Sequence, residues 1–235
     1  MTKSFLVFGS DTNNYNDNRK HIDNAHNLAN KIQLLNLFDD INVYTPDFLK
    51  KDKSFWDKHE TFINNNKRGY GYWLWKPYII KKKLENLNDG DYILYLDSDC
   101  SFINFDEKQY LINFFDIVKE NKILCVPWYG LPEVCFDKMD LIHKLDLQNN
   151  ENALISYQNQ ANVILIYVCK ETREFVNNWY ELGCDYHNID DTPSIIPNVS
   201  NFYEHRHDQS IFSLLLKKSN FHNNKITFNK CIYKR

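Results

Sequence analysis

The sequence is poor in glycine, proline and methionine, and it contains no long apolar run. Its 235 residues include 6 Gly, 6 Pro and 2 Met, whereas aromatic side chains make up 15% of the chain. Disordered chains are poor in aromatic residues and collagen-like chains are rich in Gly and Pro, so this composition excludes both classes. The longest internal apolar run, at residues 161–169, is about half of a membrane span. We therefore expect a soluble globular protein without a transmembrane segment.

The sequence also lacks a basic excess. Lys and Arg number 28 against 31 Asp and Glu, which gives a net charge of −3. Nucleic-acid binding requires basic groups that neutralise phosphates, so nucleic acid is excluded as the main partner. The six cysteines are scattered, with no Cys-x-x-Cys pair, which indicates free thiols in a reducing compartment. The expected location is the cytoplasm, either free in solution or peripheral at a membrane.

Apolar periodicity predicts alternating strands and helices. Short apolar runs predict strands at residues 4–8, 41–44, 92–96, 122–126 and 161–168. Helical spacing predicts helices at residues 19–37, 46–62, 76–87, 107–120, 170–182 and 208–217, with a loop at 184–204. This alternation predicts one α/β domain over residues 1–235, with a central, mostly parallel sheet and helices on both faces.

The most informative segment is the apolar run that ends in Asp97-Ser98-Asp99. Apolar residues without alternation predict a strand buried on both faces, and open α/β sheets bind ligands beyond the carboxyl ends of such strands. Two carboxylates at that position suit Mg²⁺ or Mn²⁺ bound to the phosphates of a substrate. The competing interpretation is a solvated turn, in which Asp is chosen for its backbone hydrogen bonds.

Four further segments carry candidate binding residues. Arg68 and Lys76 flank a stretch rich in Gly and aromatic residues, and both side chains can meet phosphate. We interpret Trp73 and Trp75 in that stretch as packing residues. The amides around Gln160 and the ring of Trp128 could line a sugar site, with turn formation and packing as the alternatives. The run from His205 to Asp208 combines two His, an Arg and an Asp where a helix cap alone needs one acidic residue.

Taken in order, these segments resemble glycosyltransferases of the GT-A fold. The resemblance rests on the first strand with Gly9, Trp-Leu-Trp-Lys-Pro at 73–77, Asp-Ser-Asp at 97–99, Gln-Asn-Gln-Ala-Asn at 158–162 and His-Arg-His-Asp-Gln-Ser at 205–210. It implies a GT-A-like single domain and a metal-dependent hexosyltransferase. The implied partners are a UDP- or GDP-sugar donor and a glycan or other hydroxyl acceptor, with Mn²⁺ or Mg²⁺ as the cofactor.

The resemblance also implies roles for individual residues. The metal ligands would be Asp97 and Asp99, completed by His205 or His207. The donor would lie against Phe8, Gly9, Asp11, Arg68, Lys76, Asp97, Ser98 and Asn162. The catalytic residues would be Asp208, His207 and Gln160, with Asp208 acting near the sugar or acceptor hydroxyls.

Two other function classes remain open. A haloacid-dehalogenase-like phosphatase also places Asp-x-Asp after an apolar strand, with Asp97 as the nucleophile and Asp190-Asp191 as the later acidic pair. Against it, the motif lies unusually far from the N-terminus, and Cys100-Ser101 is a poor match for the residues that follow it in that family. The third class is a catalytically silent, carbohydrate-binding GT-A relative, against which the intact acidic residues argue.

Overall fold

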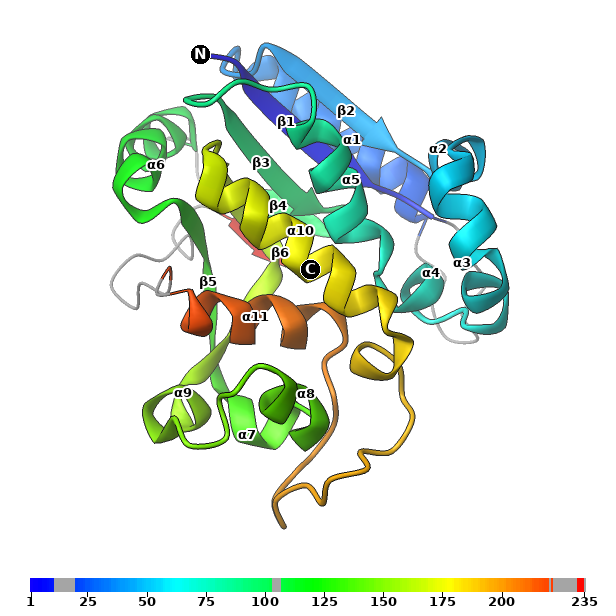
Figure 1. The fold of residues 1–235 in the computed structure, drawn as a ribbon. Coiled ribbons are helices and arrows are strands. Elements are labelled where there is room, and N and C mark those ends of the chain that lie inside the picture. Colours follow the sequence, from blue (N-terminus) through cyan, green and yellow to red (C-terminus); the bar gives the residue numbers. More distant parts are fainter. Residues whose placement is uncertain (11–19, 103–106, 220, 222–231, 235) are drawn as a thin grey trace.

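A five-stranded sheet forms the centre of the molecule (Figure 1). The structure is a computed structural model that describes residues 1–10, 20–102, 107–219, 221 and 232–234. In spatial order the strands are β2 (Asp40–Tyr44), β1 (Lys3–Phe8), β3 (Tyr92–Asp97), β6 (Tyr157–Tyr167) and β5 (Ile123–Pro132). A separate pair is formed by β4 (Cys100–Phe102) and β7 (Ile232–Lys234).

The sheet is mostly parallel, as the sequence predicts. Strand β1 pairs in parallel with β2 and β3, while β6 is antiparallel to both β3 and β5. Only β6 therefore runs against the other four strands. The predicted central position of the Asp-x-Asp strand is also confirmed, because β3 lies in the middle of the five, with Phe8 of β1 opposite Asp97 in the register.

Helices cover both faces of this sheet, which confirms the α/β prediction. On one face α1 (His21–Leu34) and α6 (Glu107–Asn121) pack against the strands. On the other face lie α5 (Trp75–Leu84), α10 (Lys170–Cys184) and α11 (Asp208–Lys218), which Figure 1 shows in front of the sheet. No helix in the described part of the chain has both the length and the apolar character needed to span a bilayer.

The alternation of side chains along β1 explains why two helix layers are needed. Phe5 and Val7 pack with α1, whereas Leu6 and Phe8 point into the opposite cluster with α5. All four side chains are at most 3% exposed. Burying each large apolar side chain stabilises the fold by about 1.5–3 kcal/mol, so a strand that is apolar on both faces needs cover on both.

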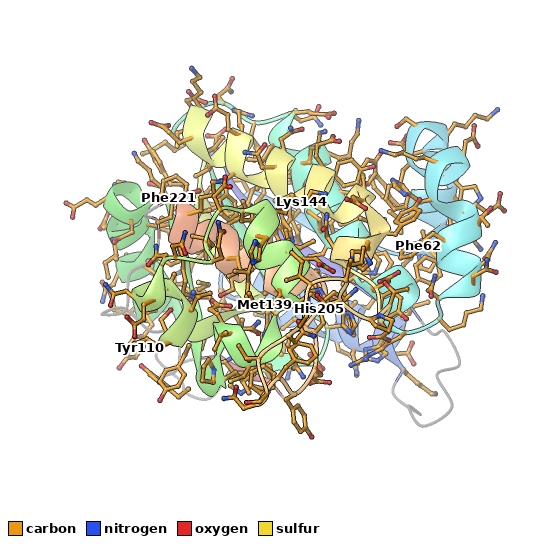
Figure 2. All side chains as sticks on the ribbon, turned by 60° about the horizontal axis from the view of Figure 1, so that its bottom comes forward. Phe62, Tyr110, Met139, Lys144, His205 and Phe221 are labelled. Atoms are coloured by element: carbon orange, nitrogen blue, oxygen red, sulfur yellow. The ribbon has the colours of Figure 1, made fainter. Side chains whose placement is uncertain are left out.

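Shorter helices fill the edges. They are α2 (Pro46–Lys51), α3 (Lys53–Asn65), α4 (Gly69–Tyr72), α7 (Glu133–Phe136), α8 (Met139–Lys144) and α9 (Glu151–Ile155), with one 3₁₀ turn at Tyr186–Asn188. The side chains of α8 lie at the front of Figure 2, where Met139 and Lys144 are labelled. The helices at 133–155 are too short to show periodicity, and the sequence analysis did not find them.

Two predicted element boundaries are wrong for identifiable reasons. The helix expected over residues 46–62 is divided at Asp52, whose carboxylate accepts a hydrogen bond from the Ser54 backbone N–H at 3.1 Å and caps a new helix. Strand β6 begins at Tyr157 rather than near Ala161, because its polar first half pairs with β5. The amides at 158–162 therefore lie within the strand and not ahead of it.

A buried histidine makes the stability of this fold sensitive to acid. His59 has no exposed surface, and its ring nitrogens lie 2.9 Å from the hydroxyls of Tyr180 and Tyr186. Burial, together with the charge of Lys58, lowers the pKa of His59 to about 4. The unfolded chain binds this proton below pH 6.5, whereas the folded chain resists it until about pH 4. The stability that neutral His59 contributes to the fold is therefore fully present above pH 6.5, and it is lost as the pH falls from 6.5 to about 4.

We predict that His59→Gln flattens the pH dependence of stability between pH 6.5 and 4. Gln keeps a hydrogen-bonding group at this position but does not titrate. The wild type should lose up to about 1.4 kcal/mol per pH unit more than the variant in this window. Urea unfolding at half-unit pH steps measures the difference. Parallel curves for the two proteins would show that His59 does not contribute to acid sensitivity.

Candidate active site

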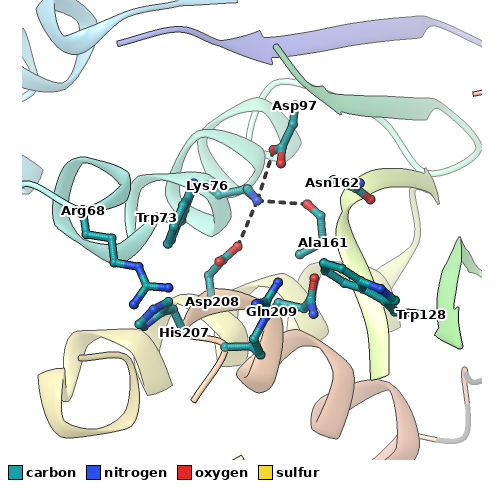
Figure 3. Close-up of a pocket in the computed structure, with 11 residues that line it drawn as sticks. Arg68, Trp73, Lys76, Asp97, Trp128, Ala161, Asn162, His207, Asp208 and Gln209 are labelled. Carbon is teal, nitrogen blue, oxygen red and sulfur yellow. Dashed lines mark hydrogen bonds and ion pairs between the residues drawn. The ribbon is translucent and has the colours of Figure 1, made fainter. Parts of the chain in front are cut away.

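A pocket opens where the carboxyl ends of β1 and β3 meet the first turns of α5 and α11 (Figure 3). It encloses about 140 Å³. Strands β1 and β3 end here, and β6, which runs the other way, brings its first half to the same end. Six residues predicted from the sequence line this cavity together, namely Arg68, Lys76, Asp97, Asn162, His207 and Asp208.

The centre of the pocket is a buried lysine between two carboxylates. Lys76 Nζ lies 3.2 Å from Asp97 Oδ1 and 3.0 Å from Asp208 Oδ2, and it donates a hydrogen bond of 3.0 Å to the backbone oxygen of Ala161. Figure 3 shows these three interactions converging on the ammonium group. Lys76 and Asp208 are each only 3% exposed. The cluster joins α5, β3, β6 and α11 through one cation.

The charges of this cluster do not balance. Burial alone lowers the pKa of Lys76, but the carboxylates of Asp208 and Asp97 outweigh burial and raise it above its ordinary value. Lys76 is therefore a cation facing two acidic groups. Burial raises the pKa of Asp208 to about 6, and Asp97 adds to this effect, while Lys76 opposes it. The cluster holds one more carboxylate than its single ammonium neutralises.

Strained backbone positions Lys76 from one side. Gly69, Tyr70, Gly71, Tyr72 and Trp73 all have positive φ, and three of these residues are not glycine. The Trp75 indole N–H donates to the Gly69 carbonyl at 2.9 Å and closes this left-handed turn directly before α5. A side chain at Gly69 would lie 2.4 Å from the Trp73 ring, so only glycine fits there. The glycine and aromatic residues of this segment therefore stabilise the turn that orients Lys76 toward the pocket.

A second strained residue, His207, precedes α11 on the other side. Its φ is 57° and ψ is −125°, and its ring stacks on Tyr72 and Trp73 with centroids 4.7 Å and 5.5 Å away. Its Nδ1 donates to the Ile189 carbonyl at 2.8 Å, which leaves the Nε2 lone pair open. Nε2 is buried without a hydrogen-bond partner among the described residues. Burial and the charge of Arg68 lower the pKa of His207 to about 3, so the ring is neutral.

His205, labelled in Figure 2, is committed to the backbone instead. Its Nδ1 accepts a hydrogen bond from the Lys138 N–H at 3.3 Å, and its Nε2 donates to the Asn188 carbonyl at 2.9 Å. Both nitrogens are therefore in use. Of the two histidines predicted as metal ligands, His207 has the open nitrogen and lines the pocket, whereas His205 supports the loop before α11.

The second carboxylate of the Asp-x-Asp is less exposed than a solvated turn would leave it. Asp99 is 7% exposed, and the neighbouring Ser98 hydroxyl lies 3.0 Å from His21 Nδ1. Asp97 accepts a hydrogen bond of 2.6 Å from the Tyr95 hydroxyl in addition to its ion pair. Across the described ranges, no three His, Cys, Asp or Glu side chains stand close enough to enclose a metal ion by themselves.

The other described residues that were predicted for the site do not line this pocket. Phe8 is 3% exposed and stacks on Trp75 with centroids 3.8 Å apart. Gly9 allows close packing of α1, since a Cβ there would lie 2.5 Å from the His21 carbonyl oxygen. Gln160 accepts a hydrogen bond of 2.9 Å from the Asn162 amide and so holds that pocket residue. Asp11 lies outside the described residues.

Two arginines and a tryptophan form the rim. Arg68 lies 3.4 Å from Asp191 and 3.9 Å from Glu204, and the guanidinium of Arg206 pairs with Glu204 as well. Arg206 also lies 4.7 Å above the ring of Trp128. Ion pairs as exposed as these contribute about 0–1 kcal/mol, so both guanidinium groups are accessible to a stronger anion.

The sequence analysis did not assign five of the lining residues to the site: Trp73, Trp128, Ala161, Arg206 and Gln209. Arg206 and Gln209 belong to the run from His205 that it singled out, so their proximity to Asp208 was the available signal. Trp73 was interpreted as a packing residue, and Trp128 was left between a sugar site and packing, because periodicity alone cannot separate the two roles. Ala161 contributes through its backbone oxygen, which no side-chain pattern reveals.

No family model matches the chain, and no curated protein sequence matches it. Among solved structures, the chain is similar to the apo form of mouse xyloside xylosyltransferase 1, with a TM-score of 0.47 and 11% sequence identity. The match covers 93% of this chain and 82% of the mouse chain. A likeness at this level carries no conclusion about the substrate or activity of this chain.

We predict that Lys76→Met is strongly destabilising, whereas Asp208→Asn is nearly neutral. Removing the ammonium leaves the buried carboxylate of Asp208 and the half-buried one of Asp97 without a counter-ion, which costs about 3–5 kcal/mol. Removing the Asp208 charge leaves the balanced pair of Lys76 and Asp97. The double variant should therefore be more stable than Lys76→Met alone. Urea unfolding of the two single variants and the double variant measures this coupling, and additive effects would contradict a shared charge cluster.

Proposed function

We propose that this chain is a metal-dependent glycosyltransferase, of the hexosyltransferase class, that moves a sugar from a UDP- or GDP-sugar to a glycan or other hydroxyl acceptor. The observation that carries the proposal is the cluster of Asp97, Lys76 and Asp208 at the carboxyl edge of the sheet, flanked by two arginines and two tryptophans. Acidic, basic, aromatic and amide groups thus surround one cavity, and each matches a different part of a nucleotide-sugar.

The cationic groups match the diphosphate. Arg68 and Arg206 present guanidinium groups at the rim, and guanidinium is the side chain best suited to bind phosphate through paired hydrogen bonds. Their present partners, Asp191 and Glu204, are partly exposed carboxylates. A diphosphate carries more charge than either carboxylate and would replace them. In this proposal the arginines stabilise the leaving nucleoside diphosphate.

The aromatic and amide groups match the sugar. Trp73 and Trp128 supply flat apolar surfaces against which the C–H face of a sugar ring can pack. Asn162 and Gln209 supply amides that can donate to and accept from hydroxyl groups. The amide of Asn162 is held by Gln160, and its Oδ1 is buried without a hydrogen-bond partner among the described residues. A sugar hydroxyl would satisfy that oxygen.

The donor chemistry of the site fits a hard divalent cation. Asp97 and Asp208 outnumber the single ammonium of Lys76, so this cluster holds one carboxylate that Lys76 does not neutralise. Mg²⁺ sites are commonly formed by one or two carboxylates together with substrate phosphates, which does not require three protein ligands in contact. We propose Asp97 and Asp99 as ligands, with His207 Nε2 as the available imidazole. When bound, Mn²⁺ or Mg²⁺ would neutralise charge on the diphosphate as a Lewis acid.

Asp208 is the proposed catalytic carboxylate. It is buried at the first position of α11 and faces the cavity beside Gln209. Transfer requires either a base for the acceptor hydroxyl or a negative group beside the oxocarbenium-like centre, and a carboxylate held in place by Lys76 can serve either need. His207 positions Asp208 through the unusual backbone that begins the helix.

The alternative functions are supported less well. A phosphatase of the haloacid-dehalogenase type needs the first Asp free to attack phosphorus, but Asp97 is held by both Lys76 and Tyr95. The second acidic pair is also occupied, since Asp190 accepts a hydrogen bond of 2.9 Å from Lys138. A carbohydrate-binding protein without catalytic activity would not need a buried charge at Asp208. An amide side chain at that position could bind a sugar hydroxyl at a lower desolvation cost.

The proposal is tested with a panel of UDP-glucose, UDP-galactose, UDP-N-acetylglucosamine and GDP-mannose incubated with the protein and Mn²⁺. We expect slow release of free nucleoside diphosphate from at least one donor, and loss of that release in chelator. Asp99→Ala should abolish this metal-dependent release while leaving the fold intact, with the exposed Asp116→Ala as the matched control. Release of phosphate from p-nitrophenyl phosphate, with every donor intact, would favour the phosphatase instead.

Asp208→Asn separates catalysis from a structural role. Asn keeps the size of Asp and can still accept a hydrogen bond from Lys76, but it carries no charge. We expect a Tm near that of the wild type and a turnover lower by roughly two or more orders of magnitude. Asp185→Asn, on an exposed carboxylate directly after α10, is the control. Normal turnover in a stable Asp208→Asn protein would limit Asp208 to a structural role.

A further inference from the structure

A row of buried polar side chains runs from the pocket into the protein behind α11. Gln209 lines the pocket, and its amide nitrogen donates to Gln158 Oε1 at 2.7 Å. The Gln158 amide nitrogen in turn donates to Asp137 Oδ1 at 2.7 Å. Gln158 and Asp137 have no exposed surface. This row, named here the amide relay, consists of Gln209, Gln158 and Asp137.

The direction of the amide relay follows from one backbone carbonyl. Gln158 Nε2 also lies 3.4 Å from the Phe136 carbonyl oxygen, which can only accept a hydrogen bond. The nitrogen of Gln158 must therefore face Phe136, and its oxygen must face Gln209. Gln209 then has to present its own nitrogen to Gln158, so its carbonyl oxygen is left for the cavity. No described residue donates to that oxygen.

Two buried carboxyl groups lie at the inner end of the amide relay. Glu133 Oε2 and Asp137 Oδ2 are both buried, and neither has a donor among the residues that the structure describes. Glu133 already accepts hydrogen bonds from Lys217 and Ser213 through Oε1. Burial, and then the neighbouring Glu133 carboxylate, raise the pKa of Asp137 well above its ordinary value, which favours a proton on Asp137. Because Asp137 Oδ1 accepts from Gln158, that proton belongs on Oδ2.

We infer that Gln158 is a positioning residue, held in turn by its hydrogen bond to Asp137, that keeps the Gln209 carbonyl oxygen toward the pocket to accept a hydrogen bond from a hydroxyl of the bound sugar or acceptor. This inference rests on the proposed function for the identity of the ligand. The orientation of the amide rests on the structure alone. Without Gln158, the Gln209 amide can rotate and present either its oxygen or its nitrogen to the hydroxyl.

The orientation is tested first without any substrate. In the wild type, the side-chain NH₂ of Gln209 should give a slowly exchanging pair of ¹⁵N–¹H signals, assigned by their loss in Gln209→Glu. Gln158→Met keeps the side-chain volume and removes the hydrogen bonds to Gln209 and Asp137. The two NH₂ protons of Gln209 should then exchange with water as fast as those of an exposed amide. Fast exchange of the Gln209 NH₂ in the wild type itself would overturn the inference, and this measurement requires no variant of Gln158 to fold.

The catalytic consequence is tested on the donor of the panel that the wild type hydrolyses fastest. Gln158→Met should lower kcat by roughly tenfold to a hundredfold, the scale expected for a misplaced group, with a smaller change in KM. Thr172→Ala is the matched control, because Thr172 is also fully buried and hydrogen-bonded, but its bonds are to the backbone of Tyr167 and Cys169 rather than to the amide relay. It should lower the Tm and leave kcat unchanged.

Asp137 supplies the conservative variant. Asn reproduces a protonated Asp, since its nitrogen can donate to Glu133 while its oxygen accepts from Gln158. Asp137→Asn should therefore retain both the slow Gln209 signals and the wild-type kcat, whereas Asp137→Leu should lose both. Slow signals with normal kcat in Gln158→Met, or lost signals in Asp137→Asn, would overturn the inference. Absence of turnover in the wild type would refute the proposed function instead and leave the exchange result valid.

Discussion

The interaction on which the pocket depends is the buried ammonium of Lys76. It contacts Asp97 at the end of β3, the Ala161 carbonyl in β6 and Asp208 at the start of α11. These elements are distant in the sequence, and each would otherwise bring an unpaired polar group into the protein. A buried cation surrounded by partners is tolerated, whereas the same groups taken singly are not. One side chain thus determines both the stability of this region and the shape of its cavity.

The backbone on either side of the pocket is strained. Tyr70, Tyr72, Trp73 and His207 all have positive φ, a conformation that costs non-glycine residues of order 1–3 kcal/mol each. Packing compensates for this cost, because the His207 ring stacks on Tyr72 and Trp73 and so joins the two strained segments. Among the described residues, four of the seven non-glycine residues with positive φ lie in the segments carrying Lys76 and Asp208, the others being Asn36, Lys122 and Asp146. Such local strain is typical of a site that must hold side chains in fixed positions.

The sequence predicted the parts of this structure that depend on local patterns. Apolar runs predicted β1, β2 and β3, and helical spacing predicted α1, α6, α10 and α11. These predictions succeed because the buried positions of a helix or strand recur along the sequence at the period of that element. The sequence did not predict the first half of β6, because its buried residues Gln158 and Asn159 are polar. Their burial is possible because they form hydrogen bonds with side chains of distant elements. The pairing of Lys76 with Asp208 depends on the packing of α5 near α11. The spacing of residues along the sequence does not predict this packing.

The polar residues of α11 explain how a core helix can also carry a site. Every residue from Asp208 to Lys217 is buried, so each polar side chain on this helix must find a partner inside the protein. An apolar helix in the same place would pack at least as tightly, but it could settle in several rotations about its axis. Ser213 and Lys217 bond to Glu133, and Gln209 bonds to Gln158, which permits one rotation only. That rotation directs Asp208 and Gln209 into the pocket. The buried polar groups of α11 therefore provide conformational specificity, and the orientation of the pocket residues follows from it.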